Sequence, residues 1–231
     1  MIVSQIGGIM GYRLDNKEID IPGKRMTKIG TGSTGDVYKY KNIALKVFKK
    51  DKNPPIDFET AKYLTSISTE RILLPRNLLF YNQSFKGYTY KLVPKKGSGK
   101  KIITLPKEAL VENIESLEKD TKKISNKKVL LNGIEPSNCI FNGNLFVSDP
   151  SQYSILESFS TKELEALNQY QIHMLLTSLI LSEIRRMNLG SSIERHIKEW
   201  LEEKDIEENT SAYLENQMNA GESIKQFLLR R

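Results

Sequence analysis

The sequence predicts an α+β protein in which a β-rich first part is followed by a mainly helical second part. Up to about residue 93, short apolar runs such as Ile43–Phe48 are separated by turn residues, which is typical of strands. After a Lys- and Gly-rich stretch at residues 95–101, which we expect to be an exposed connector, apolar residues recur at helical spacing. We therefore divide the chain into a β-rich lobe, residues 1–93, and a helical lobe, residues 94–231, which together form one domain.

A glycine-rich turn is the most distinctive feature of the first part. The segment Gly30-Thr31-Gly32-Ser33-Thr34-Gly35 lies between two expected strands, Met26–Ile29 and Asp36–Tyr40. In a dinucleotide-binding fold a helix would follow such a turn, whereas here a strand follows. The remaining expected elements of this part are the strand Ile43–Phe48, a helix over Asp57–Leu64, and strands at Leu78–Tyr81 and Tyr88–Val93.

The second part begins with an amphipathic helix, indicated by the apolar spacing of Leu110, Ile114, Leu117 and Ile124. A hairpin is expected next, because two short apolar runs at residues 139–141 and 145–147 flank Asn142-Gly143, which is favoured in tight type I′ turns. Ser160 and Glu163 form a capping box that predicts the start of a long core helix. A further helix is expected through Ile193, Ile197, Trp200 and Leu201.

Composition narrows the class of protein. The only cysteine, Cys139, cannot form an intrachain disulfide, which fits a reducing cytoplasm, with a secreted effector as the alternative. No apolar run reaches membrane-spanning length, since the best candidate, Leu175–Leu181, is broken by Thr177 and Ser178. Residues 1–104 hold 20 Lys and Arg against 8 Asp and Glu, a balance that suits a polyanion such as a nucleotide. Aromatic residues do not alternate with these lysines, so nucleic acid is not the expected partner.

The glycine turn and the strand after it suggest a phosphate site. Glycines at Gly30, Gly32 and Gly35 would let backbone amides approach phosphates without side-chain clashes, although an ordinary hairpin loop remains the alternative. Lys46 lies in an otherwise apolar strand and needs a partner, since burying an unpaired ammonium is costly. We expect Glu59 on the following helix to be this partner, with Glu70 as the alternative.

These features resemble a protein kinase from Lys28 to about Ile184. The resemblance implies a two-lobed fold that binds ATP, with Lys46 contacting the α- and β-phosphates and supported by Glu59. It makes the strand that ends at Val93 the hinge that meets adenine, with Tyr90 at the back of the pocket. The side chains it implies around the nucleotide base are Val37, Ala44, Leu92 and Val93.

The segment from Leu131 to Phe141 resembles the kinase catalytic loop in keeping Pro136 and Asn138. The resemblance implies that Asn138 and Asp149, which follows the expected hairpin, coordinate Mg²⁺.

The chain also departs from this pattern. Gly133 stands where the family has its catalytic Asp, and Glu135 stands where it has a Lys. The stretch between Asp149 and the capping box at Ser160 is too short for a full activation segment, as in the minimal kinase-like proteins of bacteria.

The resemblance implies transfer of the γ-phosphoryl group of ATP to Ser or Thr hydroxyls of a protein substrate. Glu135 is then the candidate to replace the missing catalytic Asp, because its side chain is the nearest carboxylate in the loop. Two alternatives stay open. One is a pseudokinase that binds nucleotide and acts through contacts with a protein partner, and the other is a different transfer reaction on the same fold, such as nucleotidylation or phosphorylation of a small molecule.

Overall fold

The computed structural model describes residues 11–14, 17–22, 25–49, 53–94 and 102–187. The chain divides into two compact units, which we describe separately. Unit 1 comprises residues 1–69, 73–94 and 149–154, and unit 2 comprises residues 70–72, 95–148 and 155–231. The break after Pro94 lies one residue from the predicted boundary, but the segment 149–154 belongs to unit 1. The predicted connector at residues 95–101 and the predicted helix through residues 193–201 lie outside the described residues.

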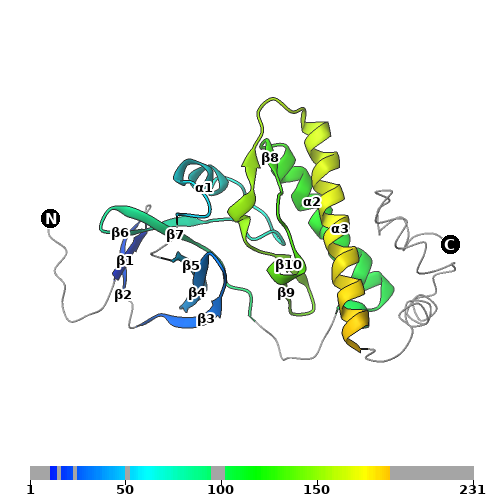
Figure 1. The fold of residues 1–231 in the computed structure, drawn as a ribbon, viewed down its shortest axis with the longest axis horizontal. Coiled ribbons are helices and arrows are strands. Elements are labelled where there is room, and N and C mark those ends of the chain that lie inside the picture. The colour runs from blue at the N-terminus through cyan, green and yellow to red at the C-terminus, as the bar shows by residue number, and fades with distance from the viewer. Residues whose placement is uncertain (1–10, 15–16, 23–24, 50–52, 95–101, 188–231) are drawn as a thin grey trace. The chain divides into compact units, whose positions relative to one another are not determined.

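Unit 1 is built on an antiparallel sheet of seven strands (Figure 1). Their order across the sheet is β2-β1-β6-β7-β5-β4-β3. The strands are β1 (Gly11–Leu14), β2 (Lys17–Pro22), β3 (Thr27–Thr31), β4 (Gly35–Tyr40), β5 (Ile43–Phe48), β6 (Asn77–Tyr81) and β7 (Ser84–Lys91). Helix α1 (Phe58–Leu64) begins at Asp57, whose carboxylate accepts a hydrogen bond from the Thr60 amide at 2.8 Å. Five of these strands were expected from the sequence, whereas β1 and β2 were not.

The strand register assigns side chains to the two faces of the sheet. One face carries an apolar cluster of Tyr12, Leu14, Ile21, Tyr40, Leu45 and Leu79. Val37, Lys46 and Tyr88 are direct cross-strand partners on β4, β5 and β7, so their side chains share the other face. Ala44 and Tyr90 are partners on this same face, two residues further along their strands. We call it the Lys46 face.

The turns of the hairpins differ from the predicted ones. Asn82 and Gln83 join β6 to β7 and both have positive φ, the conformation of a two-residue type I′ turn. The loop that was expected to be such a turn, at Asn142-Gly143, contains a third residue, since Phe141 pairs with Leu145. Only Gly143 of that dipeptide has positive φ, and the Asn142 side chain accepts a hydrogen bond from the Asn144 amide at 3.3 Å.

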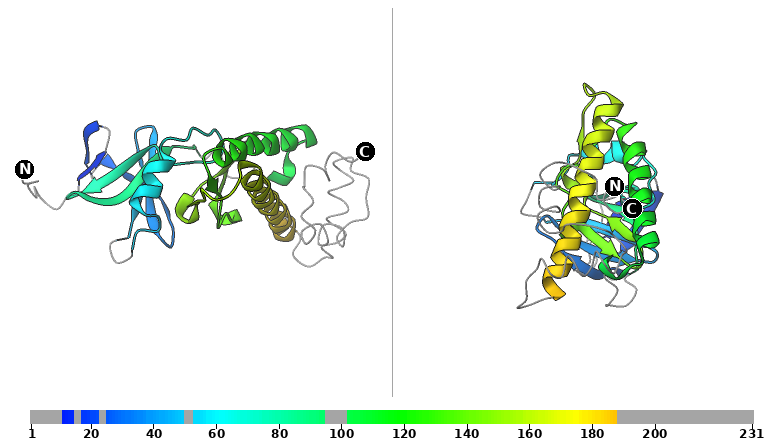
Figure 2. Two further views of the ribbon diagram at one scale, coloured as in Figure 1. Left: turned by 90° about the horizontal axis from the view of Figure 1, so that it is seen from above. Right: turned by 90° about the vertical axis from the view of Figure 1, so that its right-hand side faces the viewer.

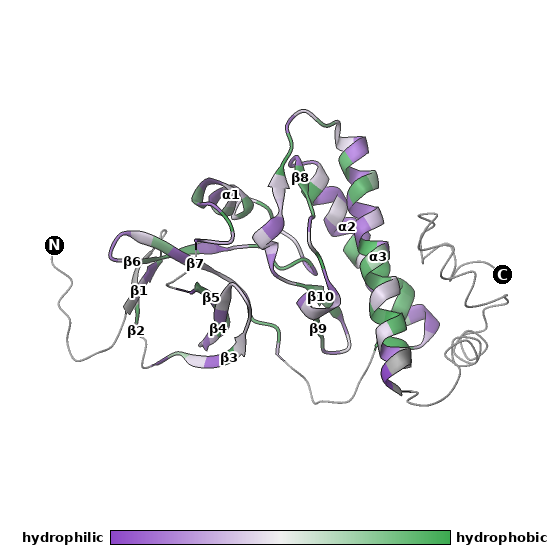
Figure 3. Cartoon of the chain, viewed as in Figure 1, coloured by the Kyte–Doolittle hydropathy of each residue, from purple (hydrophilic) through white to green (hydrophobic). Residues whose placement is uncertain are grey.

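The described part of unit 2 has two long helices, α2 (Lys107–Ser125) and α3 (Thr161–Met187), which lie side by side (Figure 2). The predicted capping box opens α3: the Ser160 amide donates to the Glu163 carboxylate at 2.8 Å, and the Glu163 amide donates to the Ser160 hydroxyl at 3.2 Å. Hydrophobic and hydrophilic residues alternate along both helices (Figure 3). None of the helices in the described ranges is long and apolar enough to cross a membrane.

Short elements complete the described chain. The strands β9 (Cys139–Phe141) and β10 (Leu145–Val147) form the predicted hairpin, and β8 (Val129–Leu130) pairs with β11 (Ser154–Ile155). The 3₁₀ turns are η2 (Ile102–Thr104), η3 (Pro136–Asn138) and η4 (Pro150–Gln152). The prediction of a mixed α+β protein is confirmed.

Buried polar side chains hold the loops of unit 2 to its helices. Asp120 of α2 accepts hydrogen bonds from three successive backbone amides, those of Glu70, Arg71 and Ile72, at 2.6 to 3.1 Å. Asn168 of α3 accepts from the Leu131 amide at 2.7 Å. These four backbone amides are thus paired inside the unit, as buried backbone groups require.

Candidate functional site

Lys46 is the charged residue at the centre of the Lys46 face. Only 5% of the residue is exposed, and its ammonium lies 2.5 Å from the Asp149 carboxylate. Both residues belong to unit 1. Strand β5 lies between β7 and β4, so Lys46 is inside the sheet rather than at its edge, and the ion pair supplies the counter-charge that its burial requires.

Asp149 has an unusual backbone conformation. Its φ of 72° and ψ of 74° lie in the left-handed region, which costs a non-glycine residue about 1 kcal/mol or more. Asp and Asn tolerate this region better than other residues do. The carboxylate also accepts from the Ser151 amide at 3.3 Å, and Pro150 follows directly. The backbone at Asp149 therefore directs the carboxylate toward Lys46 at some cost in strain, as is common at functional sites.

The expected ion pair between Lys46 and Glu59 is not formed. Glu59 lies in the first turn of α1 and its side chain is exposed, because the buried side of this short helix is made by Ala61 and Leu64. The side chain of the alternative, Glu70, is exposed as well, and its backbone amide is bonded to Asp120 in unit 2. The ion-pair partner of Lys46 is instead Asp149, which was predicted as a metal ligand.

The electrostatics of this pair follow from its burial. Burial lowers the pKa of the Lys46 amine, while the charge of Asp149 and the hydrogen bond to it act in the opposite direction. Burial also raises the pKa of the Tyr88 hydroxyl well above its ordinary value, with a further contribution from the negative charge of Asp149. The same two causes raise the pKa of Tyr90. Both tyrosines are therefore neutral hydroxyl groups at physiological pH.

The three glycines of the turn between β3 and β4 are not equivalent. A Cβ atom on Gly35 would lie 2.5 Å from the Val47 carbonyl oxygen, so Gly35 is needed for the close approach of β4 to β5. A Cβ on Gly30 or Gly32 would meet its nearest neighbours at 3.6 and 3.4 Å, ordinary contact distances. Sheet packing thus explains Gly35, whereas no close contact among the described residues requires glycine at position 30 or 32.

Of the four residues that the resemblance places around a nucleotide base, two lie in the sheet and two follow its last strand. Val37 and Ala44 project from the Lys46 face. The ladder ends at Lys91, so Leu92 and Val93 lie beyond the sheet, where their backbone is not part of a strand pair. Two further residues were not identified from the sequence: Ile29, an apolar residue at the glycine turn that is 43% exposed, and Tyr88. The strand register, which no pattern in the sequence specifies, is what identifies Tyr88.

The catalytic-loop segment belongs to unit 2. Gly133 has φ of 62°, Glu135 is exposed with its carboxylate 3.4 Å from the Ser137 hydroxyl, and the Asn138 side chain donates to the Gly133 carbonyl at 3.4 Å. The Asn138 carbonyl accepts from the amide and the hydroxyl of Ser148, which closes the base of the hairpin. Since Asn138 and Asp149 fall in different units, their joint role as metal ligands rests on the sequence resemblance.

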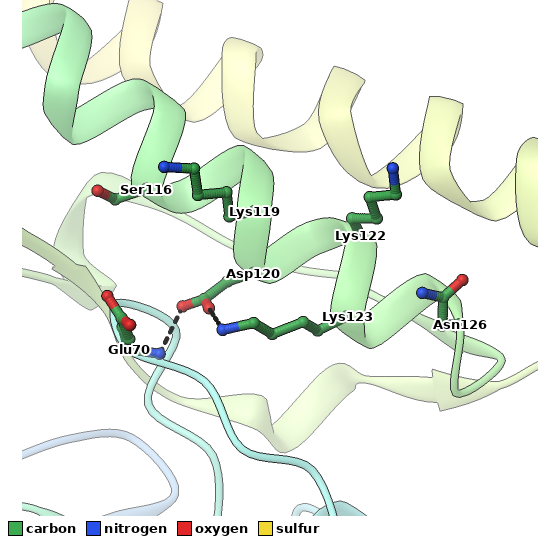
Figure 4. Close-up of a pocket in the computed structure, with 7 residues that line it drawn as sticks. All are labelled: Glu70, Ser116, Lys119, Asp120, Lys122, Lys123 and Asn126. Atoms are coloured by element: carbon green, nitrogen blue, oxygen red, sulfur yellow. Dashed lines mark hydrogen bonds and ion pairs between the residues drawn. The ribbon is translucent and has the colours of Figure 1, made fainter.

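A separate pocket of about 310 Å³ lies along α2 in unit 2. Its lining residues are Glu70, Ser116, Lys119, Asp120, Lys122, Lys123 and Asn126 (Figure 4). Asp120 is fully occupied by backbone amides and by Lys123, 3.3 Å away, while Lys119 and Lys122 point in different directions. The cationic groups do not converge on one point, so we assign no ligand to this pocket.

The residues of unit 1 are compatible with a magnesium nucleotide. No three His, Cys, Asp or Glu side chains gather as metal ligands within the described ranges. Mg²⁺ does not require such a cage, because it keeps several waters and is held by one or two carboxylates together with phosphate oxygens. Asp149 can supply that carboxylate, and Lys46 can supply a charge for phosphate. No protein-family model and no curated protein sequence matches the chain.

Proposed function

We propose that the chain is a protein-kinase-like protein that binds ATP together with Mg²⁺. The observation that carries the proposal is the ion pair between strained Asp149 and Lys46, which is buried on the sheet that also bears the glycine turn. A buried ammonium beside a carboxylate suits a nucleotide with its metal ion, because the ammonium attracts phosphate and the carboxylate attracts the cation. The two-lobed kinase fold belongs to the same proposal.

Each residue has a defined part in this function. Lys46 would hold phosphate oxygens, while the glycine turn would close over the phosphates through backbone amides other than that of Gly32, which donates to the Gly35 carbonyl at 2.8 Å. Asp149, with Asn138 assigned from the resemblance alone, would bind the metal ion, which supplies charge neutralisation for the phosphates. Val37 and Ala44 offer an apolar surface for the base. Phosphoryl transfer depends mainly on such positioning and charge neutralisation, so these residues could support transfer to a Ser or Thr hydroxyl.

A second candidate, a nucleotide-binding module without transfer activity, is favoured by Gly133. Glycine has no side chain to accept a proton, and Glu135, the candidate replacement, is an exposed side chain whose carboxylate contacts only Ser137 among the described residues. Loss of a general base typically reduces the rate by about 10² to 10⁴-fold, which weakens catalysis without abolishing it. Incubation with ATP labelled at the γ-phosphate separates these two functions, and α-labelled ATP detects nucleotidylation.

The proposal is tested by thermal unfolding with and without ATP and MgCl₂. A ligand that binds only the folded chain stabilises it by about 2.7 kcal/mol at a concentration 100 times its Kd, so the melting temperature should rise. Lys46→Ala should remove most of this rise. Lys62→Ala, which changes an exposed lysine of α1, is the matched control and should keep it. Absence of any rise in the wild-type chain at millimolar ATP would refute nucleotide binding.

A further inference from the structure

Lys46 and Tyr88 lie opposite each other on adjacent strands. The antiparallel register pairs Lys46 of β5 with Tyr88 of β7, so both side chains project from the same face of the sheet. Tyr88 is 1% exposed, and its ring packs edge-on against Phe48 and at a tilt against Tyr90, with ring centroids 5.9 and 6.1 Å apart. These contacts fix the position of the phenol ring beside the Lys46 side chain.

Both polar groups have unused hydrogen-bonding capacity. The Tyr88 hydroxyl is buried and has no hydrogen-bond partner within the part of the chain that the structure describes. An ammonium carries three N–H donors, and among the described residues Asp149 is the one group paired with that of Lys46. Leaving a buried hydroxyl or a buried ammonium donor without a partner is costly, so an arrangement that joins the two is favoured.

In the proposed function, the Lys46 ammonium needs a second hydrogen-bond partner besides Asp149. If Asp149 turns to a metal ion, Lys46 is left in the sheet without its counter-charge. Glu59, which could have stayed with the lysine, is exposed on α1. A buried ammonium that loses its only partner is strongly destabilised unless another group accepts its hydrogen bonds. On the Lys46 face, Tyr88 carries the hydroxyl oxygen directly opposite.

We propose that Tyr88 is a positioning residue for Lys46: its hydroxyl oxygen accepts a hydrogen bond from the ammonium when Asp149 turns away. In the structure Lys46 is held by Asp149, and in the ligand-bound arrangement it is held by Tyr88 while its remaining donors face phosphate. The inference rests on the proposed function, because it is the metal ion that draws Asp149 away. Tyr88, a buried residue of the sheet, thus helps to keep Lys46 extended and charged.

The test removes the Asp149 charge without using nucleotide. Asp149→Asn imitates the departure of the carboxylate, and asparagine tolerates the left-handed backbone at this position. Acylation of Lys46 by an amine-reactive reagent is followed by peptide mass spectrometry as a function of pH. The midpoint of that pH dependence reports the pKa of Lys46, whereas a change in access alters only the plateau rate. Asp149→Asn is then compared with the double variant that also carries Tyr88→Phe.

Adding Tyr88→Phe to Asp149→Asn should lower the midpoint by about one pH unit, because a hydrogen bond that stabilises the charged form of Lys46 is lost. At a fixed pH below the midpoint, the acylation rate should then be about tenfold higher. With Asp149 intact, Tyr88→Phe should have less than half of this effect. Tyr90→Phe is the matched control: it removes a hydroxyl from the same strand and face, but opposite Ala44, and it should not move the midpoint. Asp149→Gly, with and without Tyr88→Phe, provides the same comparison if the Asn double variant does not stay folded.

Equal midpoints with and without Tyr88→Phe, or an equal shift from Tyr90→Phe, would overturn the inference. A parallel measurement of the ATP-dependent melting temperature of the wild-type chain keeps the two proposals apart. If that temperature does not rise while the midpoint shifts, the proposed function fails and the contact between Tyr88 and Lys46 stands. If it rises while the midpoints coincide, only the role of Tyr88 fails.

Discussion

Alanine substitution of the turn glycines separates sheet packing from ligand binding. In Gly35→Ala the new Cβ would lie 2.5 Å from the Val47 oxygen and 3.2 Å from the Val47 carbon, both backbone atoms that no side-chain rotation can move. Strands β4 and β5 must therefore separate by about half an ångström or more. Overpacking of this kind costs about 1–3 kcal/mol. The reduced flexibility of the unfolded chain returns about 0.4–1 kcal/mol, so we expect a net loss of about 1–2 kcal/mol.

Gly30→Ala and Gly32→Ala should behave differently in the same assay. Their new Cβ atoms meet neighbours at 3.6 and 3.4 Å, so the free energy of unfolding should stay within about 1 kcal/mol of wild type. If the amides of this turn close over phosphates, an added methyl group hinders the approach of ligand, and Gly32→Ala should reduce the ATP-dependent rise in melting temperature.

Urea denaturation followed by far-UV circular dichroism measures the first effect, and thermal unfolding with ATP and MgCl₂ measures the second. A Gly35→Ala variant as stable as wild type would refute the packing argument. A Gly32→Ala variant with an undiminished response to ATP would refute the role of this turn in phosphate binding.

Three further predictions concern other residues. Asp120→Ala leaves one buried and two partly buried amides without their acceptor and should lower the free energy of unfolding by about 3 kcal/mol in urea denaturation. Glu112→Ala, on an exposed position of α2, should change it by about 0.5 kcal/mol or less. Burial holds the pKa of Lys46 below its ordinary 10.5, so the folded chain binds this proton less tightly than the unfolded chain. The contribution of Lys46 to stability should then rise with pH from the lowered pKa to about pH 10, against an opposite contribution from Cys139, whose pKa burial raises to about 12. Lys46→Met should lack the Lys46 contribution in denaturation curves at several pH values. Gly133→Asp, at a left-handed position that Asp tolerates, should increase transfer of the γ-phosphoryl group at least about tenfold if only the general base is missing. Glu135→Gln should abolish the residual transfer if Glu135 replaces that base.

Local sequence signals were sufficient for many elements of the fold. The strands β3, β4 and β5 follow apolar runs broken by glycine or polar turns, and the start of α3 follows from a capping box formed by two nearby residues. The segment Lys17–Pro22 alternates polar residues with Ile19 and Ile21, so a signal for β2 was present, but without its partner strand it is too short to stand out. The turn at Asn82-Gln83 was missed because glutamine rarely occupies such a position.

In the candidate site, most of the individual residues could be predicted from the sequence, but the contacts between them could not. Lys46 and Asp149 were each singled out by the motif around them, but their pairing depends on bringing together two segments far apart in the chain. Glu59 was expected as the partner because it lies on the next helix, yet the orientation of that helix is decided by Ala61 and Leu64 packing inward. Tyr88 carries no motif, and only the register of β5 against β7 places it beside Lys46.

The register also indicates what fixes Lys46 in place. A Cβ on Gly87 of β7 would lie 1.9 Å from the Lys46 carbonyl oxygen, and one on Gly35 of β4 would lie 2.5 Å from the Val47 oxygen. Strand β5 is therefore approached closely from both sides at two consecutive residues, and its backbone cannot shift toward either neighbour without a clash. The position of Lys46 follows from the sheet itself. If Lys46 exchanges Asp149 for Tyr88 as its hydrogen-bond partner, the movement must therefore come from the side chains of Lys46 and Tyr88 and from Asp149. Of the two residues in the ion pair, Asp149 is the one with a strained backbone.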